Sequence, residues 1–458
     1  MPSTSDEHEL HHPCTNVHNT PKYTRDGPSL PPELVREVFR YLTISMDEWK
    51  PRLPLDLMAS SMASRAWYNE ARGLIDENFF RSPLAYRRYT SAEIRRFADL
   101  IRESKRLRLD YSELMLELHL DIEADDDCDF EDIADALAAI LRLSPGNLFK
   151  LEIETANLYD PSTESDSRFY LLFDRLQPAC DSIQSIDIHG HDKRGIFALP
   201  TRLADFVASL GPRLETIRFD SCALDDAMYT ALGRCSSLQD VFLDFVAADN
   251  FHTVLPSWPR LRHFEYVHVN QNWPARTFQE LTLHCPLLTE FVFKNDLSNP
   301  LADNEPGIDN STLCLLLLHY SGLRRFEVSC NAQLNDTVLK FLLRYGRAME
   351  QIELFECGNI TGDDIMSEGD DAWPKLQSLS LLLCGGISRV FMERVVAGCP
   401  MLESVMLPEH LYEDGRLVRV MLKHGFVSDG GTWWRKESAF NYQAVYSPHI
   451  AFIVSGGE

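Results

Sequence analysis

A short apolar pattern that recurs along most of the chain constrains the fold more than any other feature. The pattern is apolar-x-x-apolar-x-apolar, and it fits eleven times between residues 115 and 407, at intervals of 23 to 35 residues. One such match arises easily by chance, whereas eleven in series indicate an internal repeat. The copies begin at Met115, Leu148, Ile183, Leu214, Leu238, Leu261, Leu288, Leu323, Met349, Leu376 and Leu402.

Each copy predicts a short strand. Its fourth and sixth residues are two apart, so their side chains point to the same face of the strand. Between copies, apolar residues take helical spacing, most clearly at 130–143, 168–177, 203–211, 335–346 and 391–399. A strand–helix unit of this size cannot bury its apolar face alone, but stacked units form a curved solenoid. We therefore expect an α/β fold with parallel strands on the concave face and helices on the convex face.

Eight of the eleven cysteines keep the register of this repeat. A small apolar side chain suits the tight corners between helix and strand. Metal binding is the alternative, but it would need paired ligands such as Cys-x₂-Cys, and the sequence has none. Four cysteines stand three residues before the first apolar position, and four stand seven or eight residues after it: Cys180, Cys235, Cys285 and Cys399, then Cys222, Cys330, Cys357 and Cys384.

Residues 105–410 resemble the leucine-rich repeat family. The segments "VSCNAQLNDTVL" (328–339) and "LFECGNITGDDIM" (354–366) are similar to the cysteine-containing subclass of these repeats. The resemblance implies a leucine-rich-repeat solenoid.

Residues 30–80 resemble a second family, the F-box. Leu-Pro-Pro at 30–32 leads into an expected helix at 33–42, with proline at an allowed helix start. Leucine or valine recurs every fourth residue along that helix, and Ser-Arg-Ala-Trp at 64–67 matches the end of the motif. Met62 stands where the family usually has valine, and the segment 43–54 is longer than the usual turn. The alternative is that these helices are only a cap for the solenoid.

The two resemblances together imply a substrate receptor of a Skp–cullin–F-box ubiquitin ligase. The F-box would dock on a Skp-type adaptor and through it on a cullin, while the repeats hold a protein substrate for ubiquitination. The chain itself would perform no catalysis. Some of the residues that the resemblance assigns to docking would instead form the core of the module. They are Leu30, Pro31, Leu34, Val38, Phe39, Leu42, Leu57, Met62 and Trp67.

The substrate surface is expected on the concave face, where the third, fifth and seventh positions of each copy point away from the helices. Carboxylates outnumber basic residues at these positions, which favours a basic substrate segment held by apolar anchors. A solvated acidic face is an equally weighted alternative. The candidate substrate-binding residues are Arg218, Phe242, Glu265, Val292, Glu327, Glu353 and Phe355.

Charge and hydropathy restrict the partners. The formal net charge of −25 repels phosphate backbones and anionic lipids, so neither nucleic acid nor a membrane surface is an expected partner. No apolar run approaches the roughly 18 residues of a membrane span. Residues 1–29 lack the features of a signal peptide and are expected to be a disordered leader. We therefore expect a protein of the cytoplasm, the nucleus or both, with reduced thiols.

The sequence carries no phosphate loop, nucleophile elbow or His-Glu-x-x-His motif, so we expect neither an enzyme nor a cofactor. His189 and His191 in "HGHD", the histidines within 9–14 and the acidic run at 125–132 are weak metal candidates. The acidic run more simply supplies negative charge to the start of the following helix.

The expected organisation is a leader (1–29), an F-box-like helical module (30–80), a helical linker (81–104), the solenoid (105–410) and a C-terminal cap or tail (411–458), with some strand in 433–454. Two other functions stay open besides the ligase receptor. One is a non-ligase repeat scaffold or regulatory binding protein. The other is a GTPase-activating repeat protein that supplies an arginine, although no arginine is marked for that role.

Overall fold

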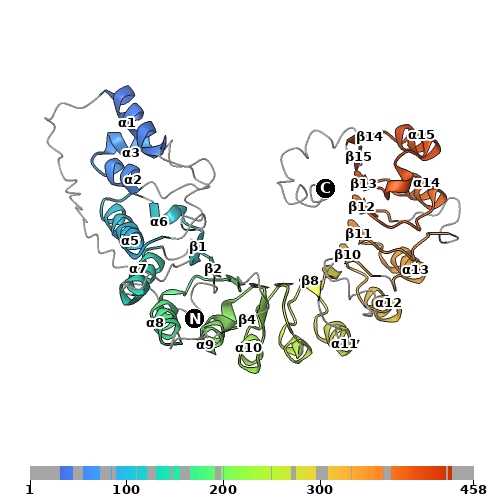
Figure 1. Cartoon of the computed structure of the whole chain (residues 1–458), viewed down its shortest axis with the longest axis horizontal. Helices are drawn as coiled ribbons and strands as arrows, with labels where there is room; N and C mark the ends of the chain where they lie inside the picture. The colour runs from blue at the N-terminus through green and yellow to red at the C-terminus, as the bar shows by residue number, and fades with distance from the viewer. Residues whose placement is uncertain are drawn as a thin grey trace, which may run out of the picture.

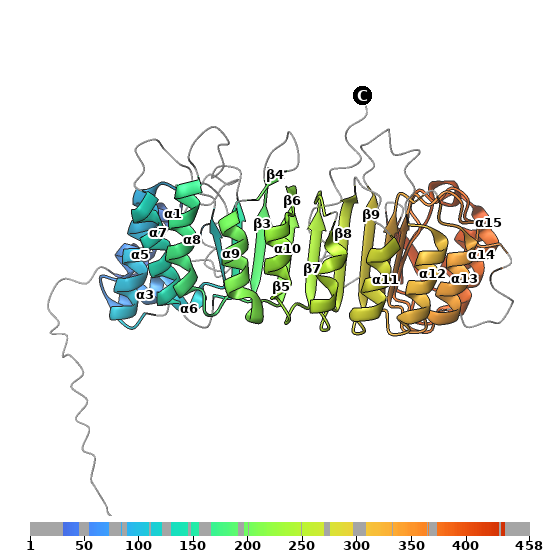
Figure 2. The same ribbon diagram turned by 90° about the horizontal axis from the view of Figure 1, so that it is seen from below.

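The chain is a curved α/β solenoid, with strands along the inside of the curve and helices along the outside (Figure 1). Turned by 90°, the same solenoid shows its helices side by side in front of the strands (Figure 2). Packed helices are about 10 Å apart and strands about 4.8 Å apart, so a row of such units must bend toward its strands. The computed structural model describes residues 31–44, 55–72, 84, 89–109, 111–120, 130–144, 148–154, 166–190, 197–199, 201–248, 250–269, 275–295, 308–331, 333–363, 365, 373–429 and 432–435.

One sheet of thirteen strands runs through the described residues, and every pairing from β1 to β13 is parallel. A separate two-stranded pair joins β4 (Phe197–Ala198) to β6 (Cys222–Ala223). The strands of the large sheet, in spatial order, are β1 (Glu117–Leu120), β2 (Lys150–Glu154), β3 (Ser185–His189), β5 (Thr216–Asp220), β7 (Asp240–Asp244), β8 (His263–Val269), β9 (Glu290–Asn295), β10 (Arg325–Ser329), β11 (Gln351–Phe355), β12 (Ser378–Ser380), β13 (Ser404–Met406), β15 (Thr432–Arg435) and β14 (Phe426–Asp429).

Helices cover the outer face of this sheet. The α-helices are α1 (Pro32–Ile44), α2 (Leu55–Ser61), α3 (Arg65–Arg72), α5 (Ser91–Arg106), α6 (Tyr111–Leu114), α7 (Phe130–Leu143), α8 (Asp166–Leu176), α9 (Thr201–Leu210), α10 (Asp226–Leu232), α11 (Ala275–His284), α12 (Asn310–His319), α13 (Asp336–Tyr345), α14 (Arg389–Gly398) and α15 (Gly415–Lys423). Short 3₁₀ turns are η1 (Gln177–Ala179), η2 (Gly211–Arg213), η3 (Phe251–Thr253), η4 (Leu255–Ser257) and η6 (Glu409–Leu411). The five helices predicted from apolar spacing are α7, α8, α9, α13 and α14, with ends shifted by at most two residues.

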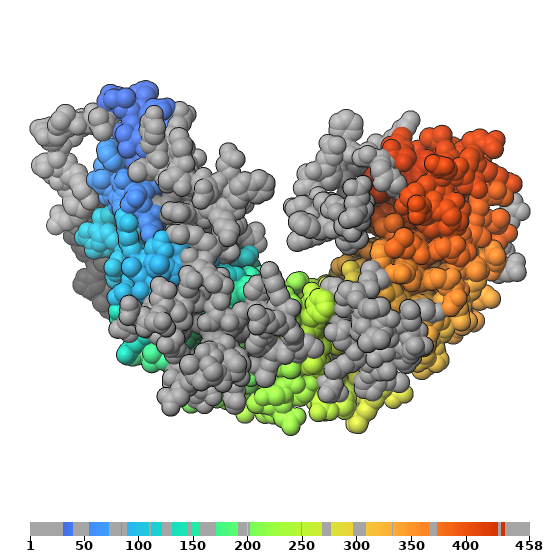
Figure 3. Space-filling model, in the orientation of Figure 1, coloured from blue at the N-terminus to red at the C-terminus, as the bar shows by residue number. Residues whose placement is uncertain are grey.

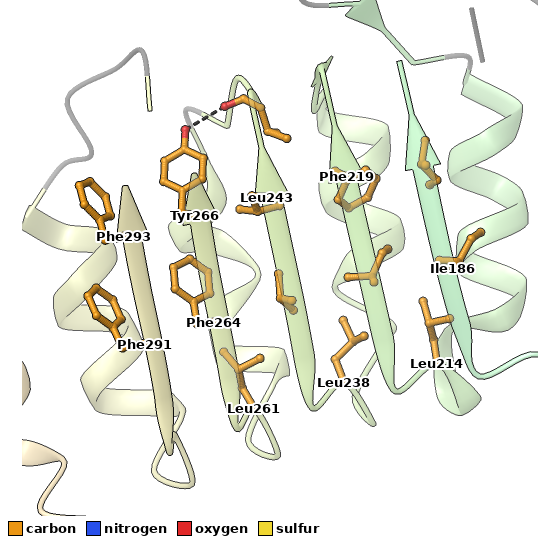
Figure 4. Close-up of a cluster of buried hydrophobic side chains, with 14 of the residues drawn as sticks. Ile186, Leu214, Phe219, Leu238, Leu243, Leu261, Phe264, Tyr266, Phe291 and Phe293 are labelled. Carbon is orange, nitrogen blue, oxygen red and sulfur yellow. Dashed lines mark hydrogen bonds between the residues drawn. The ribbon is translucent and has the colours of Figure 1, made fainter. Parts of the chain in front are cut away.

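The eleven predicted copies are the eleven parallel strands, which confirms the repeat and the solenoid. The three apolar positions of every copy are buried, with at most 2% of any of these residues exposed. Figure 4 shows the resulting rows in the middle of the sheet, where Leu243, Tyr266 and Phe293 lie side by side on successive strands. One continuous hydrophobic core results from this stacking.

A sharp corner follows several strands at the same point of the repeat. Five non-glycine residues, each seven positions after the first apolar residue, have a left-handed backbone with φ between 50° and 57°: Ser221, Phe245, Cys330, Glu356 and Leu383. Left-handed φ is unfavourable for such residues. The backbone N–H of four of them donates to a carbonyl of the next repeat, as from Ser221 to Asp244 at 2.8 Å. At these four corners, the next repeat therefore holds the backbone of the one before it.

The cysteines occupy the corners that the sequence predicted. Cys222, Cys357 and Cys384 follow the left-handed residue and are fully buried. Burial raises the pKa of Cys180, Cys235 and Cys285 to about 12, so these side chains remain thiols at neutral pH. Their role is packing.

Both ends of the solenoid are covered. At the N-terminal end, α1, α2 and α3 form a helical module whose core is continuous with that of the repeats. Ser61 and Tyr111 share a 2.6 Å hydrogen bond across this junction. At the other end, β15 pairs antiparallel with β13, and β14 extends the hairpin. The strand predicted within 433–454 overlaps β15, while the rest of that range and the leader at 1–29 lie outside the described residues.

Among the described residues, no helix has the length and apolar content needed to span a bilayer.

Tyr266 provides a test of how strongly the repeats depend on one another. Its buried hydroxyl donates to the carbonyl of Val246 at 2.8 Å, drawn as the dashed line in Figure 4. Tyr266→Phe leaves that carbonyl without its donor, and we expect a loss of about 1–2 kcal/mol in the free energy of unfolding. Chemical denaturation measures this. Tyr345→Phe is the matched control, because Tyr345 is half-buried and its hydroxyl bonds to no described residue; equal losses in both variants would contradict the assignment.

Candidate functional site

The concave wall consists of the third, fifth and seventh positions of the strands from β1 to β13. Parallel pairing places the fifth-position residues in one unbroken row, in the order His119, Glu152, Asp187, Arg218, Phe242, Glu265, Val292, Glu327, Glu353, Ser380 and Met406. Figure 3 shows the hollow that the curved solenoid encloses. Because neighbouring strands are about 4.8 Å apart, side chains of this row contact one another directly.

Histidines and carboxylates meet in the first section of the wall, on β1, β2, β3 and β5. Oε1 of Glu152 lies 3.1 Å from Nδ1 of His119 and 3.4 Å from Nε2 of His189. Nδ1 of His189 lies 3.3 Å from Oδ2 of Asp220. Burial alone would lower the pKa of His189, but bonding to Asp220 and Glu152 raises it to about 10. Burial would likewise raise the pKa of Glu152, yet His119, His189 and Lys150 hold it well below its usual range.

An aromatic side chain occupies the middle of the wall, on β5, β7 and β8. The guanidinium of Arg218 lies over the ring of Phe242, 4.6 Å from its centroid. The imidazole of His263 packs edge-on against the same ring, also with centroids 4.6 Å apart. Nε2 of His263 lies 3.4 Å from Oε2 of Glu265. This Arg218–Phe242–His263–Glu265 stack is partly exposed, and it presents aromatic, cationic and anionic surface side by side.

A buried ion network occupies the next section, on β9, β10 and β11. The carboxylate of Glu327 is almost fully buried and pairs with both Lys294 and Arg325, the latter at 2.8 Å. Glu353 lies beside Glu327 in register. Burial and the negative charge of Glu327 raise the pKa of Glu353 to about 7. Glu353 is therefore partly protonated at neutral pH, when it can donate a hydrogen bond to Glu327.

These pairings change the expected character of the wall. The excess of carboxylates read from the sequence is largely compensated locally, because Asp187 pairs with Lys150 at 2.7 Å and Glu327 with two cations. The sequence analysis also missed the role of His263, which sits at a third position. The sequence offered one indication of this role: on successive copies, the third-position residues His263 and Arg325 flank Glu290.

Two candidate substrate residues are not accessible. Val292 is fully buried, so the expectation of an apolar anchor there is wrong; it lies in register between Glu265 and Glu327. Glu327 is also fully buried, so the expectation that it contacts a substrate directly is wrong. Arg218, Phe242, Glu265, Glu353 and Phe355 are each partly exposed.

The candidate docking residues of the N-terminal helical module divide into two groups. Phe39 and Leu57 are fully buried in the core, and Met62 and Trp67 are half-buried, with Trp67 edge-on to Phe39 at 5.5 Å. Pro31, Leu34 and Val38 are exposed. Leu34 is 52% exposed and Val38 is 44% exposed, one helical turn apart on α1. Leu30 and the side chain of Leu42 lie outside the described residues.

The three weak metal candidates of the sequence lie only partly among the described residues. His189 lies on β3 and joins the cluster around Glu152, while His191, the segment 9–14 and residues 125–129 of the acidic run lie outside the described residues. The end of the acidic run opens α7, with Glu131 and Asp132 in its first turn.

No protein-family description matches the chain, and no curated protein matches it. Among solved structures, a chain of the crystal structure of the Rad7 and Elc1 complex in yeast is similar at 14% identity and a TM-score of 0.40, over 76% of this chain and 91% of that chain. The leucine-rich repeat-containing protein LegL7 from Legionella pneumophila is similar at 9% identity and a TM-score of 0.31, over 69% of this chain and 92% of its own. At these levels of similarity, neither assigns a function to this chain.

The Glu327 network gives a test of the wall's stability. Glu327→Gln leaves Lys294 and Arg325 without their buried counter-charge, and we expect a loss of about 3–5 kcal/mol in the free energy of unfolding. Denaturant titration measures it. Glu290→Gln on the adjacent strand is the control, because its carboxylate is 40% exposed and lies 3.9 Å from Arg325. We expect that control to lose about 1 kcal/mol or less.

Glu353 predicts a pH dependence. Its carboxyl has a pKa of about 7 in the folded chain, against about 4.5 when unfolded, so the folded state holds the extra proton between those values. Stability therefore falls as pH rises from 4.5 through 7. We expect Glu353→Gln to remove this fall, making the variant more stable than the wild type by about 1–3 kcal/mol at pH 8 but not at pH 4.5. Parallel pH–stability curves for the two proteins would contradict the assignment.

Proposed function

We propose that the chain is a substrate receptor of a cullin–RING ubiquitin ligase. In this proposal the N-terminal helical module is an F-box that docks on a Skp-type adaptor, and the concave wall holds a protein substrate. The observation that carries it is the exposed apolar face of α1.

That face is not needed for the packing of the module. Val35 and Phe39 of α1 are buried and complete the core, so they are sufficient to explain why the helix packs there. Arg36 pairs with Glu70 of α3 at 2.6 Å and fixes the helix against its neighbour. Pro31, Leu34 and Val38 are needed for neither task, yet they are exposed together. Apolar anchors one turn apart on a helix suit insertion into a groove of a partner.

The resemblance of residues 30–67 to the F-box supplies the identity of that partner. Among the seven motif residues whose side chains the structure describes, Phe39 and Leu57 lie inside and Leu34 and Val38 outside, which supports a docking module. The substrate side of the proposal rests on the Arg218–Phe242–His263–Glu265 stack. Aromatic and arginine side chains that are partly exposed at the centre of a concave surface are typical of binding hot spots.

The alternative function is a non-ligase scaffold in which α1–α3 only cap the repeats. The continuous core between the module and the repeats is compatible with both functions. The ligase receptor gives the exposed face of α1 a role, whereas a cap alone does not.

The test is binding of the full chain to a purified Skp-type adaptor, measured by calorimetry. We expect Leu34→Asp combined with Val38→Asp to weaken binding by more than about 100-fold, because two buried apolar anchors contribute about 1.5–3 kcal/mol each. Leu422→Asp is the matched control: Leu422 is 55% exposed on α15, at the other end of the solenoid. We expect this control to bind like the wild type.

Circular dichroism and thermal melting should show that the double variant stays folded, since both side chains already lie at the surface. If the intact chain binds no Skp-type adaptor, or if the double variant binds as tightly as the wild type, the scaffold alternative holds.

A further inference from the structure

A buried imidazole nitrogen and a carboxylate oxygen face each other at the start of the concave wall. His119 is only 7% exposed, and its Nδ1 is buried 3.1 Å from Oε1 of Glu152. The pair does not form a well-aligned hydrogen bond, and Nδ1 of His119 has no hydrogen-bond partner. A buried imidazole nitrogen without a hydrogen-bond partner is costly. A cation between the two atoms would give that nitrogen a partner.

A third ligand lies beside them. Ligand atoms of His119, Glu152 and Glu154 all lie within 4.8 Å of one another. Two ligands of one tetrahedral zinc ion, each about 2.1 Å from the metal, are roughly 3.4 Å apart, so small side-chain rotations would bring these atoms into coordination. Glu152 and Glu154 alternate along β2, and therefore both point to the concave side, while His119 comes from β1 in register with Glu152.

We propose that His119, Glu152 and Glu154 form a binding site for a divalent transition-metal ion of the zinc class. One imidazole with two carboxylates suits zinc, while calcium prefers a larger number of oxygen ligands. Three protein ligands leave a fourth coordination position on the concave side, open to water or to a side chain of a bound partner. The site is independent of the proposed ligase function.

The neighbouring residues favour zinc binding by His119, Glu152 and Glu154 over binding by a second group of ligand residues nearby. Among the described residues, only two groups bring three such ligand atoms within 4.8 Å of one another, and both contain Glu152. The second group uses Asp187 and His189. Asp187 already bonds to Lys150 at 2.7 Å, and His189 lies 3.3 Å from Asp220, so an ion there would have to displace existing pairs. In the preferred set, His189 instead contacts the ligand Glu152, as partners in the outer shell of metal sites do.

The test is titration of the metal-free full chain with zinc chloride by calorimetry. We expect one zinc ion to bind at this site. Its affinity should fall by roughly 100-fold in His119→Gln and by at least roughly 10-fold in Glu154→Gln. His263→Gln is the matched control: this imidazole lies near Glu265 and Glu290 on the wall, but among the described residues it belongs to no set of three ligand atoms within 4.8 Å of one another. Zinc bound by the histidines within 8–14 would be the same in all variants. The measurement is therefore the difference in zinc binding between the wild type and each variant.

Cobalt(II) provides a second measurement that does not depend on variants folding. Bound to the wild type, it should show the visible bands of nitrogen and oxygen coordination without the near-ultraviolet charge-transfer band of thiolate ligands. Zinc should also raise the melting temperature of the wild type but not of Glu154→Gln. The proposal is overturned if His119→Gln and Glu154→Gln bind zinc like the wild type, or if the only bound cobalt shows thiolate coordination.

Discussion

Each repeat of this chain has an apolar face that only its neighbours can cover. The whole structure depends on this burial between neighbouring repeats. The fourth and sixth residues of each copy face the helices, and in-register parallel pairing brings them together into a continuous core. The corner after the strand adds a second dependence, because its left-handed residue is held by a carbonyl of the next repeat. The two ends then need covering, which the helices α1–α3 and the hairpin of β14 and β15 provide. Stability in such an array is a sum of neighbour terms.

The same register that builds the core also fixes the chemistry of the concave wall. A one-residue shift of any strand would send its charged side chains into the core, so each fifth-position residue has a fixed neighbour on either side. Charged groups placed about 4.8 Å apart must be paired, protonated or solvated. The wall uses all three solutions. Glu327 is paired with two cations, Glu353 keeps its proton to about pH 7, and the stack around Phe242 stays partly exposed.

The sequence was sufficient to predict the repeat, the strands and five helices, because apolar periodicity follows directly from which side chains must be buried. It was also sufficient to predict which residues point into the concave space. It could not predict which of them remain accessible. Val292 and Phe242 occupy equivalent positions two copies apart, yet Val292 is buried, whereas Phe242 is partly exposed between Arg218 and His263. Accessibility depends on the tertiary surroundings of each position, which a single copy of the pattern does not contain.

In the N-terminal helices, too, the sequence did not predict which apolar residues are buried and which are exposed. Their pattern alone did not separate residues that hold the module together from residues that could contact a partner, since both are apolar and share a helix. Burial separates them: Phe39 contacts Trp67 inside, while Leu34 and Val38 remain exposed. An exposed apolar face costs solubility and adds nothing to the fold, so a cap alone gives no reason to keep it. The face therefore favours a partner at the N-terminal end, apart from whatever the concave wall binds. Under the proposed function, one protein would bind at this end and another along the concave wall.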